Sequence, residues 1–248
     1  MRKIAVALSK GGVGKTTTAV NLAAGLSARG YHVLLIDMDT QGQAAQALGI
    51  NNRHGLVELV AGKCQAQDAV VKARDQLWLL VGGRELAGLK REIARKDFGS
   101  EQTVSDALEP LDGRYDYVII DTAPGWDSLT INAIFYATEI IAPVALESMA
   151  LQGLREFGVS LSAIQRYHRR LGLNYILPTF MDRRVKKSQQ IYDLLLEYYH
   201  DRVCDPIRYN VRLSEAPGLG QTIFEFAPRS AGAADYQALV SRILADED

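Results

Sequence analysis

The stretch Ser9-Lys10-Gly11-Gly12-Val13-Gly14-Lys15-Thr16-Thr17-Thr18 decides the fold that this sequence predicts. An apolar run at residues 4–8 precedes it and indicates a buried strand, and apolar residues at helical spacing follow it. A glycine-rich turn between a strand and a helix brings backbone N–H groups together with the positive end of the helix dipole. This context predicts a phosphate-binding loop, in which Lys15 reaches the β- and γ-phosphates and the Thr16 hydroxyl binds Mg²⁺.

The composition of the whole chain is that of an ordinary globular protein. The chain has 248 residues, 48% of them hydrophobic, and a formal net charge of −1, so nucleic-acid binding would need a local basic patch. Cys64 and Cys204 are far apart and form no C-x-x-C motif, which argues against a zinc or iron–sulfur site. No apolar run reaches about 18 residues. We expect a single cytoplasmic domain over residues 1–248, without an N-terminal helix-turn-helix domain because the first strand begins at once.

A second apolar run, residues 32–37, ends in an acidic loop. A helix over residues 15–29 that stops at Gly30 separates the two runs, which predicts a parallel strand–helix–strand unit. Ligands of such units bind at the carboxyl ends of the strands, where Asp37 and Asp39 stand. Beside a phosphate loop, one carboxylate can help to hold hydrated Mg²⁺ and the other can orient an attacking water.

A third apolar run, residues 115–121, ends in Asp121, which is the Walker B arrangement. The carboxylate at this position binds a water of the magnesium shell. Further apolar runs at 77–81, 139–144 and 174–180 alternate with helical patterns, including 150–171 and a helix that opens at 183 and continues to 199. The pattern predicts an α/β fold in three layers, with a mostly parallel twisted sheet of about seven or eight strands flanked by helices.

A local basic segment runs from residue 155 to residue 187, with eight Lys or Arg and two acids, a net charge of +6. It ends in the sequence Arg183-Arg184-Val185-Lys186-Lys187. Cations at a helix N-terminus are unfavourable, so this cluster indicates binding of an external anion.

Several motifs resemble those of one family. Ser9 replaces the first glycine of the general P-loop pattern, and K-G-G-x-G-K-T resembles the deviant Walker A motif of the ParA/MinD superfamily of P-loop ATPases. The D-x-D-x-Q element at 37–41 and the D-x-x-P-G element at 121–125 are similar to that superfamily's motifs. The sequence N-V-R-x-S-E-A-P at 210–217 and P-x-S-x-G-A at 228–233 resemble the Soj-type ParA branch. The sequence departs from the family at Ala227, which replaces Asp, at Thr40, which often is proline, and at Tyr209, where relatives often have arginine.

The resemblance implies a slow, Mg²⁺-dependent ATPase that segregates DNA. ATP closes a homodimer in which Lys10 reaches into the phosphates of the partner, and the dimer binds double-stranded DNA without sequence preference. A centromere-binding, ParB-like adaptor stimulates hydrolysis and releases the protein from the nucleoid. Gly125 lets a backbone N–H move toward the γ-phosphate.

The implied site residues fall into four groups. Those with catalytic roles are Lys10, Lys15 and Asp39, the last of which positions the water. Nucleotide contacts are expected at Lys10, Gly11, Gly12, Val13, Gly14, Lys15, Thr16, Thr17, Asp182, Arg208 and Asn210. Magnesium is expected at Thr16, Asp37 and Asp121, and DNA at Arg184, Lys186, Lys187 and Arg212.

Other functions remain open at this point. A ParA-like ATPase that positions another cargo has the same sequence features. A MinD-like ATPase recruited to membranes would end in a basic amphipathic helix, whereas residues 241–248 are acidic toward the end. A nitrogenase-reductase-like carrier needs paired cysteines, and a signal-recognition GTPase needs an N/T-K-x-D motif; neither is found.

Overall fold

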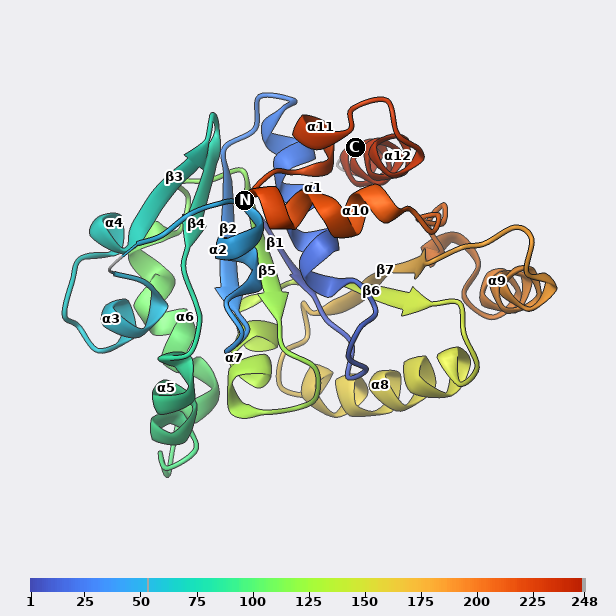
Figure 1. The fold of residues 1–248 in the computed structure, drawn as a ribbon. Helices are drawn as coiled ribbons and strands as arrows, with labels where there is room; N and C mark the ends of the chain where they lie inside the picture. Colours follow the sequence, from blue (N-terminus) through green and yellow to red (C-terminus); the bar gives the residue numbers. More distant parts are fainter. Residues whose placement is uncertain (53, 247–248) are drawn as a thin grey trace.

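The computed structural model describes residues 1–52 and 54–246, so the last two residues of the acidic end lie outside the described residues. Over this range the chain forms one seven-stranded sheet in the order β3-β4-β2-β5-β1-β6-β7 (Figure 1). Only the pair β3–β4 is antiparallel. The strands are β1 (Arg2–Val6), β2 (Val33–Met38), β3 (Val70–Arg74), β4 (Leu77–Leu80), β5 (Tyr117–Thr122), β6 (Glu139–Ala145) and β7 (Gly172–Thr179).

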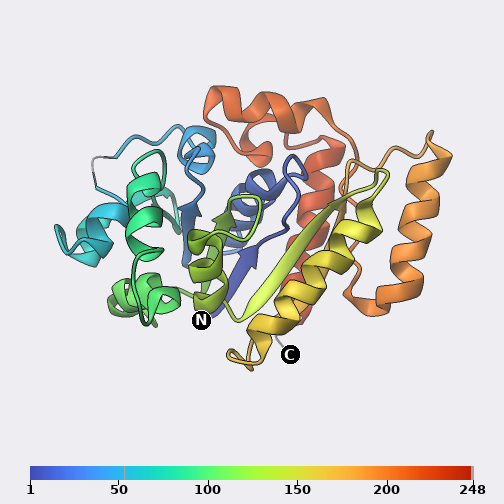
Figure 2. The same cartoon turned by 90° about the horizontal axis from the view of Figure 1, so that it is seen from below.

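Helices cover both faces of the sheet, as Figures 1 and 2 show. On one face lie α1 (Lys15–Ser27), α2 (Gln43–Ala47), α11 (Ile223–Phe226) and α12 (Ala231–Ala245), and α10 (Val211–Glu215) lies nearby. The other face carries α3 (Leu56–Val60), α4 (Ala66–Ala69), α5 (Leu86–Ile93), α6 (Thr103–Leu108), α7 (Ser128–Tyr136), α8 (Ala150–Gln165) and α9 (Lys186–Tyr199). The three-layer α/β fold expected from the sequence is confirmed.

The central strands are buried because both of their faces pack against helices. Along β2 and β5 every residue is buried, so these strands read as continuous apolar runs rather than as alternating patterns. Alternate side chains divide between two cores: Leu34 and Ile36 pack under α5 and α7, and Val33 and Leu35 pack under α1. This construction gives β1, β2 and β5 fixed neighbours, so that their carboxyl ends meet at one edge.

Three local features differ from the sequence-based expectation. The edge strand β3 is not among the expected strands, because Val70–Arg74 is short and mixes charged with apolar residues. The helix expected over 150–171 ends at Gln165, and the residues after it form turns such as the one closed by His168 N–H on the Ile164 carbonyl (3.0 Å). The helix expected to open within the basic cluster begins only at Lys186, so the residues at 183 and 184 lie in the preceding turn.

Within residues 1–52 and 54–246, no helix combines the length and the hydropathy needed to cross a bilayer.

Candidate nucleotide-binding site

The glycine-rich loop joins β1 to α1 in a conformation that needs glycine. Gly12 and Gly14 have φ angles of 72° and 88°, in the left-handed region where a Cβ is strained. Gly14 directly precedes α1. The first backbone N–H groups of the helix, which have no acceptor within the helix, therefore face the loop. The Thr179 hydroxyl, at the end of β7, donates to the Val13 carbonyl (3.0 Å) and anchors the loop from behind.

Lys15 is buried at the base of the loop, with only 7% of its surface exposed. Its Nζ donates to the backbone carbonyl of Lys10 across the loop (2.8 Å). Burial lowers the pKa of Lys15, and the charges of Asp121 and Asp39 act in the opposite direction. The Lys15 ammonium is therefore held against the loop, near two carboxylates, where a phosphate can replace the Lys10 carbonyl as its partner.

Asp37 lies near the end of β2 and is completely buried. Its carboxylate accepts hydrogen bonds from the backbone N–H groups of Asp39 (3.0 Å) and Ala44 (3.1 Å). Burial raises the pKa of Asp37 to about 6, although these hydrogen bonds favour the ionised form. The Asp37 carboxylate thus holds the acidic loop in shape. Its raised pKa favours protonation in mildly acidic solution, and a bound cation would oppose that protonation.

Asp121 lies near the end of β5 and is also completely buried. Within the described part of the chain, neither of its carboxylate oxygens has a hydrogen-bond partner by distance and angle. Burial and the charge of Asp37 raise the pKa of Asp121 well above its ordinary value, while the Thr16 hydroxyl nearby lowers it. A buried carboxylate without a partner is costly, and a cation with its water shell would satisfy it.

The oxygen atoms of Thr16, Asp37 and Asp121 fit a magnesium ion whose other ligands are waters and the phosphates of a nucleotide. Among residues 1–52 and 54–246, no cluster of three or more His, Cys, Asp or Glu side chains forms a metal site by itself. Magnesium usually keeps several waters and binds through one or two carboxylates together with substrate phosphates. The Thr16 hydroxyl with Asp37 and Asp121 supplies such a partial set.

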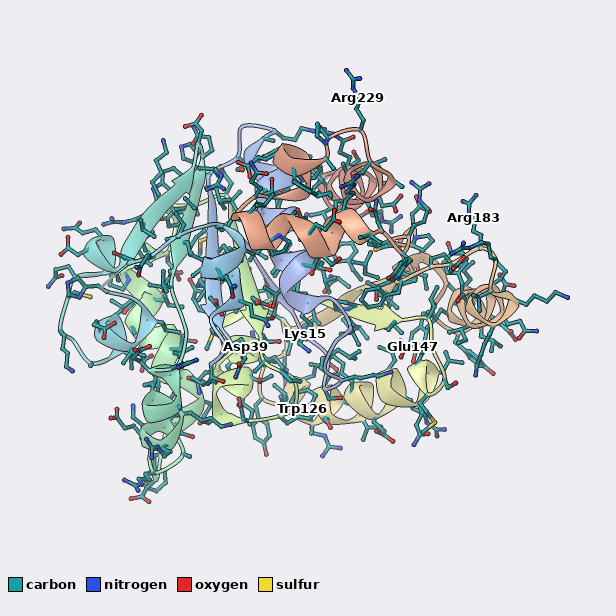
Figure 3. All side chains as sticks on the ribbon, in the orientation of Figure 1. Lys15, Asp39, Trp126, Glu147, Arg183 and Arg229 are labelled. Atoms are coloured by element: carbon teal, nitrogen blue, oxygen red, sulfur yellow. The ribbon has the colours of Figure 1, made fainter. Side chains whose placement is uncertain are left out.

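The phosphate loop opens into a cavity of about 670 Å³. Figure 3 shows Lys15 and Asp39 close to the middle of the molecule, at the edge of the sheet where the strands end. Asp39 is 8% exposed, and one of its oxygens accepts from the Gln41 N–H (3.0 Å). The cavity brings together these expected site residues: Gly11, Gly12, Gly14, Lys15, Thr16, Thr17, Asp39, Arg208 and Asn210.

Four of the other expected residues are placed around this cavity rather than on its wall. Val13 is buried behind the loop, and Asp37 and Asp121 lie beneath it. Asp182 does not line the cavity: both of its oxygens accept from the guanidinium of Arg184 (2.9 and 2.7 Å).

Lys10 points away from the cavity of its own chain. Its Nζ pairs with the Glu147 carboxylate at 3.2 Å, in the turn that follows β6, and both side chains are exposed to solvent. Figure 3 shows Glu147 at some distance from Asp39 along the same edge of the sheet. A lysine of the phosphate loop that turns outward can meet a second molecule.

The residues expected to bind DNA lie on the surface, and three of them have partners within the chain. Arg184 holds the pKa of Asp182 down at about 2, and Arg212 pairs with Glu215 at 2.9 Å. Lys187 contacts the Ser148 hydroxyl, and Lys186 is exposed at the start of α9.

The two segments that carry these basic residues, 183–187 and the one that includes Arg212, begin next to each other in the fold. A backbone bridge joins Met181 to Arg208. Residues 183–187 come shortly after Met181, and Arg212 comes shortly after Arg208. Both basic segments therefore start at the same edge of the sheet.

Several residues of the cavity wall are not among those expected from the sequence. Lys90 and Asp127 form an ion pair there (2.8 Å), and Phe180 and Tyr236 line the wall as well. Thr179 could have been found from its place at the carboxyl end of a parallel strand, where ligand sites gather. Lys90 and Tyr236 carry no local signal, because their elements reach the site only through the tertiary fold.

The loop between β1 and α1, with carboxylates near the ends of the two strands β2 and β5, defines a P-loop nucleotide-binding protein. Residues 1–173 match a family model described as an AAA domain. The chain is 38% identical over 247 residues to the chromosome-partitioning ATPase Soj of Thermus thermophilus, covering 99% of this chain and 96% of that protein. It is 36% identical over 251 residues to the sporulation initiation inhibitor protein Soj of Bacillus subtilis, with coverage of 98% on both sides. The chain belongs to the ParA/MinD superfamily, in its Soj/ParA branch, which confirms the resemblance seen in the motifs.

Solved structures share the same fold. Cobyrinic acid a,c-diamide synthase from Mycobacterium smegmatis, solved with a bound ATP analog and magnesium, is 30% identical with a TM-score of 0.84 and coverage of 98% of this chain and 94% of that one. The ATP complex of a McdA variant from Cyanothece has a TM-score of 0.84 at 22% identity, covering 99% and 96%, which shows the fold alone. The expectation of ATP and Mg²⁺ agrees with the ligands of these structures.

Proposed function

We propose that this chain is a ParA-type partition ATPase of one domain, which hydrolyses ATP slowly with Mg²⁺ and acts as an ATP-bound dimer on DNA. The observation that carries the proposal is the buried carboxylate of Asp121 near the end of β5. Asp121, without a hydrogen-bond partner in the described chain, interacts electrostatically with Lys15 beneath a loop built for phosphate. The Asp121 carboxylate can accept hydrogen bonds from a hydrated cation, and the loop and Lys15 beside it can donate hydrogen bonds to a phosphate.

In the proposed reaction each residue has a limited task. The backbone N–H groups of the loop and Lys15 bind the phosphates, and Thr16, Asp37 and Asp121 hold the magnesium shell. Magnesium, when bound, neutralises the charge that develops on the β- and γ-phosphates. Asp39 orients the attacking water, because the Gln41 N–H fixes its Oδ1 and holds the carboxylate at the cavity wall.

The direction of Lys10 supports the proposed dimer. In the single chain its ammonium pairs with Glu147 at the surface and does not line its own cavity. Exposed ion pairs are worth only about 0–1 kcal/mol, so the γ-phosphate of a partner molecule can compete for it. A closed dimer places two copies of each basic segment on one particle, which strengthens DNA contacts that are weak and salt-screened singly.

We further propose that the dimer is nucleoid-associated in the cytoplasm and that a centromere-bound, ParB-like adaptor triggers hydrolysis and release. The support is family membership together with the exposed basic segments at 183–187 and 212. A ParA-like protein that positions another cargo would share the ATP cycle and the DNA-bound state.

The test combines nucleotide and DNA binding in one series. Wild type should bind DNA with Mg-ATP and release it with Mg-ADP, whereas Lys15→Gln should bind neither nucleotide nor DNA, because the phosphates lose their buried counter-charge. Arg91→Gln is the matched control, since Arg91 is an exposed cation on α5 that does not line the cavity. DNA binding that is independent of nucleotide would contradict the proposal. If ATP-dependent binding persists but no centromere complex stimulates hydrolysis, the cargo is not a centromere.

A further inference from the structure

The Arg208 guanidinium in the cavity wall is already bound by the protein. Its Nε donates to both oxygens of Asp235 (3.0 Å each), and Nη2 donates to Oδ1 at 2.6 Å. The backbone N–H of Arg208 donates to the same carboxylate at 2.9 Å. Asp235 therefore holds both the main chain and the side chain of one residue, and its own side chain is only 10% exposed. Such bidentate, charge-assisted contacts fix geometry more strongly than a single hydrogen bond does.

The segment from Ile207 to Asn210 is also held by backbone hydrogen bonds and by the buried side chain of Ile207. It follows an extended stretch and holds to the sheet edge through Ile207 N–H on Pro178 (2.8 Å) and Tyr209 N–H on Met181 (3.0 Å). Asn210 turns inward to accept the Arg212 N–H and begin α10. This segment forms part of the cavity wall.

Helix α12 contacts the phosphate-loop helix α1 as well. Tyr236, the residue after Asp235, is fully buried, and its hydroxyl lies 3.1 Å from the Thr18 hydroxyl in the first turns of α1. One turn earlier, Gly232 packs so closely that a Cβ there would lie 3.0 Å from Leu213 and 3.1 Å from the Asn210 amide. Residues of α12 one turn apart therefore touch both the phosphate-loop helix and the 207–210 segment.

We propose that Asp235 is a positioning residue for nucleotide binding: it clamps Arg208 and thereby holds the 207–210 segment at the distance from α1 that a nucleoside requires. Arg208 then serves the clamp and not the phosphates, in contrast to the direct contact expected from the sequence. This inference rests on the proposed binding of ATP in this cavity. It concerns the part of the ligand beyond the phosphates, because the phosphates are held by the loop and Lys15.

The experiment measures equilibrium binding of Mg-ATP and of Mg-tripolyphosphate to the full chain and its variants. Asp235→Ala and Arg208→Ala should each weaken Mg-ATP binding by about fivefold to tenfold, which is the scale of one net hydrogen bond, because the clamp acts on the nucleotide only indirectly. The double variant should lose no more than either single one, because both break the same clamp. Affinity for tripolyphosphate should stay within about twofold of wild type, which a general loss of folding could not produce.

The control is Glu215→Ala, which releases Arg212 from a more exposed ion pair in the same region but outside the cavity wall. It should bind both ligands as wild type does. Additive losses, or a much larger effect of Arg208→Ala, would show direct contact of Arg208 with the nucleotide and overturn the clamp. Equal loss of tripolyphosphate and Mg-ATP would also overturn it. If neither wild type nor Lys15→Gln bound Mg-ATP, the proposed function itself would fail.

Discussion

Asp37 and Asp121 stand at the same register position of the neighbouring parallel strands β2 and β5. Both are completely buried, and burial raises the pKa of each, with the charge of Asp37 adding to the effect on Asp121. Two buried carboxylates side by side are unfavourable without a cation. The arrangement therefore makes the folded protein itself sensitive to proton and magnesium binding.

Asp121→Asn should stabilise the magnesium-free protein while removing hydrolysis. The folded-state pKa of Asp121 lies above its value in the unfolded chain, so the folded state binds more protons and stability falls as pH rises between those two values. Asparagine resembles the protonated carboxyl and removes that fall. Thermal unfolding in a chelator, from about pH 4 to pH 8, should show a higher Tm for the variant at the upper end, by about 2–4 °C per kcal/mol recovered.

Asp97→Asn is the control for this change, because Asp97 is exposed in the bend that follows α5, and its Tm profile should follow wild type. A variant Asp121→Asn that is less stable than wild type at neutral pH would contradict the account of an uncompensated buried charge.

Asp39→Ala should bind Mg-ATP and form the dimer but hydrolyse ATP at least about 100-fold more slowly, because the attacking water loses its acceptor. Single-turnover phosphate release is the measurement. Asp97→Ala removes an exposed carboxylate in the bend that follows α5, so it serves as the control with near-normal rates. Hydrolysis at the wild-type rate by Asp39→Ala would assign the water to another residue.

Lys10→Ala should remain a monomer with ATP while keeping some affinity for the nucleotide, because its ammonium belongs to the partner's phosphates in the closed dimer. Light scattering in an Asp39→Ala background, where ATP persists, should show the monomer mass, against twice that mass for Asp39→Ala alone. Glu147→Gln breaks the same surface ion pair from the other side, and this variant should still dimerise. A dimer formed by Lys10→Ala would defeat the proposed role.

Arg184→Glu should abolish ATP-dependent binding to two unrelated DNA duplexes and leave dimerisation intact. Removal of one phosphate contact by Arg184→Ala should reduce the log–log salt slope by about 0.9 for each site in the dimer. Arg91→Glu makes the same charge change on α5, at the other side of the molecule from α9 in Figures 1 and 2, and should bind as wild type does. Unchanged binding by Arg184→Glu would move the DNA site elsewhere.

The sequence alone was sufficient for the features that depend on neighbouring residues. Gly12, Gly14 and Lys15 indicate the loop because positive φ angles and a lysine at a helix start are local requirements. Apolar runs that end in Asp37 and Asp121 indicate parallel strands, and the rule that ligands gather at strand ends places both carboxylates beside the loop. These parts of the site follow from short-range patterns.

Only the tertiary structure decided which distant side chains meet. Asp235 lies 27 residues from Arg208, and their pairing depends on how α12 packs against α1 and the sheet edge. The outward turn of Lys10 toward Glu147 likewise joins residues 137 positions apart. No local pattern encodes such contacts, because the choice among possible partners for an arginine or a lysine is made by the packing of whole elements, which brings one carboxylate within reach and leaves the others in solvent.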